Sequence, residues 1–141
     1  MTALTPYLFF GGRCEEALAF YRDAVGAEVE MVMRYDESPE PVPPGMLQAG
    51  FEKKVMHASV RIGGARLMAS DGCDDRATKF DGFKVALTLP TEAAARTAFD
   101  GLAAGGTVEM PLTPTFWSPC FGMLADKFGV SWMVMVPGQA G

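Results

Sequence analysis

This chain of 141 residues has few of the side chains that most often form disulfides or hold metals. It contains one histidine and three cysteines, and the cysteines are widely spaced and odd in number. This pattern argues against a disulfide framework and favours a reducing, cytoplasmic location. No apolar run reaches the length of a membrane span, and no basic stretch precedes the first apolar segment as in a signal peptide. We therefore expect no membrane partner.

Basic residues are also scarce. The 12 lysines and arginines are outnumbered by 17 acidic residues, which gives a formal net charge of −5. A chain with this balance lacks the basic face that phosphate backbones require, so nucleic acid is not an expected partner. The pair Gly11-Gly12 is followed by Arg-Cys-Glu-Glu. This is not the glycine-rich loop of a nucleotide or methyl-donor site.

The sequence repeats itself. Residues 19–31, moved forward by 79 positions, fall on residues 98–110, and seven of the thirteen positions are identical without a gap. The identical residues include the Val-Glu-Met triplets that begin at Val29 and Val108. A duplication of this kind predicts two copies of one supersecondary unit, and two facing copies enclose a cleft.

Each copy is predicted to follow the order βαβββ, which makes the chain an α+β protein. The first helix is expected over 14–25, because Leu18, Tyr21 and Val25 form an apolar stripe and Gly26 is a natural stop. The expected strands are 6–10, 28–35, 55–62 and 66–70 in the first copy and 83–89, 107–112, 121–126 and 131–136 in the second, whose helix is expected up to 104 after Thr91 as N-cap.

The two copies differ in one long segment. The last hairpins align with a shift of 66, which matches Gly63 with Gly129 and Leu67 with Met133. The difference, 79 minus 66, indicates that the proline-rich segment 36–50 is an insertion of about 13 residues, expected as a surface loop. We predict one domain, 1–141, made of repeats 5–70 and 82–137. Their connector, 71–81, carries an acidic cluster expected to be a solvated turn: Asp71, Asp74 and Asp75.

Paired βαβββ units resemble the vicinal-oxygen-chelate superfamily, which includes glyoxalase I, extradiol dioxygenases and bleomycin-binding proteins. The resemblance covers essentially the whole chain. The final hairpin, DKFGVSW (126–132), is similar to the superfamily's D-P-x-G signature, with Lys127 in place of proline. Three stretches resemble the PhnB-like branch, often labelled 3-demethylubiquinone-9 3-methyltransferase: HASVRIGGARLMASD (57–71), TFWSP (115–119) and FGMLADKFGVSWMV (121–134). The resemblance implies two sheets that curl into a partly open, barrel-like cleft.

Superfamily enzymes hold a divalent metal with His, Gln and Glu side chains, two from each copy. Counting from matched landmarks, the resemblance places these positions at Pro6, Leu67, Lys84 and Met133. Proline and leucine have no donor, and lysine is a protonated cation at pH 7. The resemblance therefore implies that the metal site has been lost, and we expect no metal and no other cofactor.

Several other side chains are candidates for a ligand pocket. His57 is the one side chain whose unperturbed pKa lies near neutrality, and it is either a general base or polar anchor, or a strand-end histidine bonded to backbone. Cys14, at a helix start, is either reactive or a small buried apolar residue. The aromatic loop before the last hairpin either stacks on a ligand or packs in a core or dimer interface. The predicted pocket residues are His57, Lys84, Phe116, Trp117, Phe121 and Met133.

Three functional hypotheses follow. The first is a metal-free protein that binds a small apolar or aromatic molecule in its cleft. The second is a metal-dependent lyase, isomerase or dioxygenase of the same superfamily. The third is a structural or interaction module with a filled cleft. In each case exposed sheet edges and a duplicated geometry favour a symmetric homodimer.

Overall fold

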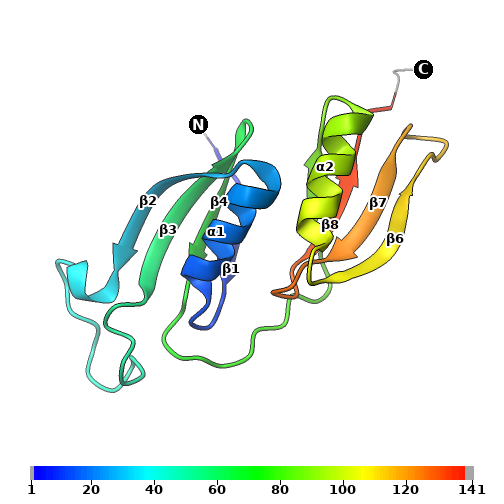
Figure 1. The fold of residues 1–141 in the computed structure, drawn as a ribbon. Helices are drawn as coiled ribbons and strands as arrows, with labels where there is room; N and C mark the ends of the chain where they lie inside the picture. The colour runs from blue at the N-terminus through cyan, green and yellow to red at the C-terminus, as the bar shows by residue number, and fades with distance from the viewer. Residues whose placement is uncertain (1, 139–141) are drawn as a thin grey trace. The chain divides into compact units, whose positions relative to one another are not determined.

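The computed structural model describes residues 2–138 (Figure 1). Its contacts divide the chain into two compact units, Met1–Thr78 and Lys79–Gly141, which we call unit 1 and unit 2. The boundary lies inside the predicted connector, 71–81. Neither helix in the described part has the length and apolar character needed to cross a lipid bilayer.

The predicted order of elements is confirmed in both units, which makes this an α+β fold. Unit 1 contains β1 (Tyr7–Phe9), α1 (Cys14–Val25), β2 (Glu28–Arg34), the short 3-10 helix η1 (Tyr35–Glu37), β3 (Val55–Ile62) and β4 (Ala65–Ser70). Unit 2 contains β5 (Val85–Thr88), α2 (Glu92–Ala103), β6 (Thr107–Thr113), β7 (Phe121–Ala125) and β8 (Ser131–Met135). The 3-10 helix was not predicted, and it ends β2 one residue before the expected boundary.

The helix ends follow from their sequence signals. Gly26 terminates α1 with a φ of 69°, a left-handed conformation that glycine adopts at little cost. Thr91 caps α2, because its side-chain oxygen accepts a hydrogen bond from the backbone N–H of Ala94 at 3.1 Å.

Each unit holds one four-stranded mixed sheet, and the two sheets have matching topology. The strand orders are β1-β4-β3-β2 and β5-β8-β7-β6. The first strand of each unit pairs in parallel with the last, and the remaining pairs are antiparallel. Neither sheet closes into a barrel, and in each unit one helix lies against one face of the sheet (Figure 1). We call the opposite side the helix-free face.

The strand register corrects the alignment of the last hairpins. Val29 pairs with Val60, whereas Val108, 79 residues further on, pairs with Leu124, which lies only 64 residues beyond Val60. The insertion is therefore 15 residues (79 minus 64) rather than 13. The sequence alignment was misled because the β3–β4 turn has two residues between Ile62 and Ala65, whereas β7 and β8 enclose residues 126–130.

The side chains beneath the helices form the core of each unit. In unit 1 these strand residues are Leu8, Val55, Ala58, Val60, Leu67 and Ala69. In unit 2 the largest is Trp132, which is 1% exposed, with Leu124 and Val134 on the neighbouring positions of the same face. Because strand side chains alternate between faces, the residues between these core positions lie on the helix-free face.

Two buried carboxylates close the loops of the two units. Asp71 was expected in a solvated turn, but it is 2% exposed and accepts hydrogen bonds from the backbone N–H groups of Cys14 at 2.7 Å and Val55 at 2.8 Å. Asp126 accepts from the Nε1–H of Trp132 at 2.9 Å. It also accepts from the backbone N–H of Val130 at 3.1 Å. The aspartate of the signature hairpin is therefore a structural residue, and Lys127 in the next position leaves its bonds intact.

Gly122 tests how tightly α2 packs on its sheet. A Cβ atom at Gly122 would lie 2.8 Å from the ring of Phe99 on α2 and 3.1 Å from Leu112. We expect Gly122→Ala to lower the free energy of unfolding by about 1–3 kcal/mol, because the helix must move to accept the methyl group. Chemical denaturation measures this difference. The matched control is Gly64→Ala, where a Cβ atom meets nothing within 4 Å; equal stabilities of the two variants would contradict the packing described.

Candidate functional site

The helix-free face of the unit 1 sheet carries an aromatic cluster. Tyr7 and Phe9 alternate with the buried Leu8 on β1, and they are 37% and 49% exposed. Their rings stack with centroids 5.0 Å apart and planes at 24°. The register places Met68 beside Tyr7, so this face combines aromatic rings with a thioether rather than charged groups.

His57 belongs to this cluster. Its Nδ1 lies 2.8 Å from the phenol oxygen of Tyr7, within hydrogen-bonding distance, and the two ring centroids are 5.5 Å apart. The histidine is thus bonded to a side chain, not to the backbone group that one interpretation of the sequence expected. Burial raises the pKa of Tyr7, with Cys14 as the next contribution, so the phenol is neutral at pH 7.

The sequence analysis did not select Tyr7 or Phe9 for the pocket. The alternation Tyr-Leu-Phe-Phe in the first strand contained the signal, since its two half-exposed aromatic residues share the face opposite Leu8. What the sequence could not supply was the order β1-β4-β3, which brings His57 within reach of Tyr7 across the intervening strand.

The helix-free face of unit 2 carries a row of methionines. Met133 on β8 pairs with Met123 on β7, which pairs with Met110 on β6. The three side chains are partly exposed, while their neighbour Trp132 is buried on the opposite face. Methionine side chains adapt their shape and are polarizable, so this row suits contact with a flat apolar molecule.

The aromatic loop adjoins this row of methionines. Trp117 packs edge-on against Phe121 with ring centroids 5.3 Å apart, and Phe116 packs against Trp117 at 4.7 Å. Phe121 is buried, Trp117 is 47% exposed and Phe116 is 97% exposed. The loop is held by Ser118, whose buried hydroxyl donates to the carbonyl of Val136 at 2.6 Å or of Cys120 at 2.8 Å. Of the three predicted aromatic residues, Trp117 is the one both exposed and packed on its neighbours.

Two further predicted residues, Lys84 and Met133, line a single cavity. It has a volume of about 520 Å³ and lies wholly in unit 2. Lys84 Nζ is 3.3 Å from both carboxylate oxygens of Glu109, so the cavity contains one ion pair. Its other walls are formed by Phe80, Asp81, Gly82, Phe83 and Ser131.

The four positions assigned to a metal are not equivalent pairs in the structure. Met68 pairs with Tyr7, and Met133 pairs with the residue 79 positions further on, so the counterpart of Met133 is Met68. Leu67 is buried beneath α1 at 4% exposure. On β1 and β5 the same register shows that Pro6 and Lys84 also differ by one position.

The chemistry of these positions does not fit the ligands of the superfamily's enzymes. The register replaces the aliphatic Leu67 by Met68, a thioether that suits soft metals rather than the usual imidazole and carboxylate sites. Within residues 2–138, no three His, Cys, Asp or Glu side chains gather where they could hold a metal ion.

Cys14 is not suited to nucleophilic chemistry. It is fully buried, and burial, with the nearby carboxylates of Asp71 and Glu15, raises the pKa of its thiol to about 12. A thiol with this pKa is almost entirely protonated at neutral pH, and the thiolate is the reactive form. Cys14 is therefore a small buried apolar residue, the second of the two alternatives drawn from the sequence.

Comparison with known proteins identifies the family. Residues 3–134 match the model of the Glyoxalase/Bleomycin resistance protein/Dioxygenase superfamily. The chain is 38% identical over 143 residues to the protein YjdN of Escherichia coli K12, with 96% of each chain covered. It is similar to the crystal structure of PA1353 from Pseudomonas aeruginosa, with a TM-score of 0.81, 38% identity and coverage of 97% and 98%. It is also similar to a PhnB protein from Bacillus cereus, with a TM-score of 0.77, 32% identity and coverage of 96% and 99%. The chain therefore belongs to the Glyoxalase/Bleomycin resistance protein/Dioxygenase superfamily and is a PhnB- and YjdN-like member of it.

Proposed function

We propose that this chain binds a small, largely apolar or aromatic molecule on the helix-free face of its sheets, without a bound metal. The observation that carries the proposal is that Lys84 and Met133 line one cavity of about 520 Å³. This volume is within the range of small-molecule sites, which combine apolar walls with a few polar groups. The ion pair of Lys84 with Glu109 supplies such polar groups at this cavity.

The aromatic cluster of unit 1 supports the same proposal. The exposed stack of Tyr7 on Phe9 offers a flat apolar surface, and His57 beside it adds a polar anchor. Aromatic faces of this kind favour planar ligands, because ring stacking adds about 0.5–1.5 kcal/mol to the burial of area. Apolar surface left partly exposed on a folded chain indicates a binding site more often than an accident of packing.

An anionic aromatic probe tests the proposal. We expect 1-anilinonaphthalene-8-sulfonate to bind saturably to the folded chain and to raise its melting temperature with concentration. Met133→Glu should weaken this binding about tenfold, because it removes apolar surface and places a carboxylate near the sulfonate. Fluorescence titration measures both values.

The matched control is Met46→Glu, an exposed position in the insertion, which should bind the probe as the unaltered chain does. If both variants lose binding equally, the probe reports general apolar surface and the proposed site is wrong. If the folded chain binds no probe, the alternative of a filled interaction module is favoured.

A metal-dependent lyase, isomerase or dioxygenase is the second candidate, because superfamily membership is shown and this chemistry occurs within the superfamily. The two candidates predict different metal contents. We expect the chain, purified without chelator, to contain nickel, zinc, iron and manganese far below one ion per chain by mass spectrometry of the elements. One equivalent of any of these metals, removed by chelator and restored on addition, would overturn the metal-free proposal.

We also propose that the protein forms a symmetric homodimer. In each four-stranded sheet the first and second strands of the unit are edges, with unpaired backbone groups along one side. Proteins protect such edges, and a second copy can cover them. Light scattering should give twice the mass of the chain at micromolar concentration; the mass of a single chain would contradict the proposal.

A further inference from the structure

The proline-rich insertion of unit 1 has a fixed conformation. The backbone N–H of Gln48 donates to the carbonyl of Cys73 at 2.8 Å, and the side-chain oxygen of Gln48 accepts from the backbone N–H of Asp75 at 3.0 Å. Phe51, at the end of the insertion, is 4% exposed. The insertion is thus bonded to the segment that follows β4, although unit 2 has no counterpart of it.

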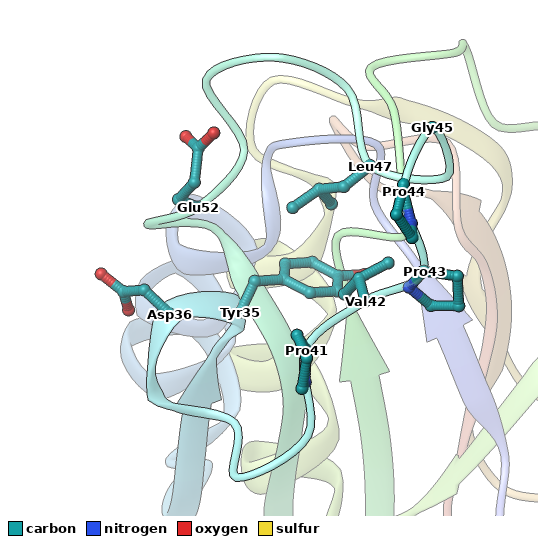
Figure 2. A pocket seen from close by; sticks show the side chains of 9 residues that line it. All are labelled: Tyr35, Asp36, Pro41, Val42, Pro43, Pro44, Gly45, Leu47 and Glu52. Carbon is teal, nitrogen blue, oxygen red and sulfur yellow. The ribbon is translucent and has the colours of Figure 1, made fainter.

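This insertion encloses a cavity of about 250 Å³ (Figure 2). A volume of this size equals about eight water molecules in the liquid, enough for a molecule of similar heavy-atom count. Tyr35 forms one wall, and Figure 2 shows its ring extended between Leu47 and Pro41. The remaining lining residues are Asp36, Val42, Pro43, Pro44, Gly45 and Glu52.

The walls of the cavity are pre-organised. The phenol of Tyr35 donates to the carbonyl of Gly72 at 2.6 Å, which fixes the direction of the ring. Burial, and then the neighbouring Cys73, raises the pKa of Tyr35 to about 12, so the phenol is neutral at pH 7. Proline has a fixed φ, and rigid walls lose little conformational freedom when a ligand binds.

The charge around the cavity has one sign. The segment 36–52 contains four acidic residues and no lysine or arginine. Two of the acids, Asp36 and Glu52, line the cavity and are held together by a bond from the backbone N–H of Asp36 to the carbonyl of Glu52 at 2.9 Å. Asp36 pairs with the exposed Lys53, whereas Glu52 has no ion-pair partner among residues 2–138.

We propose that this cavity is a second ligand site, which binds a small organic cation carried on an apolar stem. The stem lies against the prolines and Leu47, and the ammonium group lies near Glu52 and the face of Tyr35. Aromatic faces attract cations, and an unpaired carboxylate adds a charge contact. The site is separate from the proposed site on the helix-free faces, so either can fail without the other.

Three probes of nearly equal size distinguish the chemistry: benzylammonium, benzyl alcohol and benzoate. In amide NMR spectra of the full chain, we expect benzylammonium to shift signals from residues 35–52 saturably, with weaker effects from the alcohol and weakest from benzoate. Added salt should weaken the binding of benzylammonium, because the contact with Glu52 is exposed. Equal binding of the alcohol, tighter binding of benzoate, or shifts confined to other residues would overturn the proposal.

Variants then assign the contacts. Glu52→Gln should weaken benzylammonium binding about three- to tenfold, as expected for a partly exposed charge contact, whereas the matched Glu92→Gln on α2 should have no effect. Tyr35→Leu should weaken binding and Tyr35→Phe should retain it, since the ring rather than the hydroxyl faces the cation. Unchanged binding by Glu52→Gln in a chain with an unaltered melting temperature contradicts the proposed role of Glu52 and with it the cation site.

Discussion

The functional surface of this protein depends on one constraint: each four-stranded sheet has a single helix, which covers only one of its two faces. Side chains alternate along each strand, so the residues that pack beneath the helix fix which residues point the other way. In β8, burial of Trp132 beneath α2 places Met133 on the helix-free face. In β1, burial of Leu8 does the same for Tyr7 and Phe9.

The residues on these faces indicate binding rather than metal chemistry. A divalent metal needs several imidazole or carboxylate ligands aimed at one point, whereas the helix-free faces carry thioethers and aromatic rings. The exceptions are few and specific, namely the bond between His57 and Tyr7 and the ion pair of Lys84 with Glu109. These groups can orient a ligand that apolar contacts retain, which is the usual division of labour in small-molecule sites.

Much of the fold could be predicted from the sequence, because helix stripes, glycine stops and strand alternation are local signals that repeat in both halves. The position of Gly63 against Gly129 was misleading, since loops of different length conceal the true register. Asp71 looked like part of a solvated turn, because a sequence does not reveal which carboxylate will meet two buried N–H groups. The bond between Tyr7 and His57 depends on strand order, and no pattern of spacing encodes it. Lys84 and Met133, by contrast, were selected from the sequence and share one cavity.

The central claim is that the methionine-rich helix-free face of unit 2 contacts a bound aromatic molecule. NMR spectra of the chain labelled at its methionine methyl groups test this most directly, because Met110, Met123 and Met133 form one row, while Met46 lies in the insertion. When anilinonaphthalene sulfonate saturates the chain, the three signals of the row should shift and the Met46 signal should not. A bound probe that leaves the row unshifted, or that shifts Met46 alone, would contradict the account.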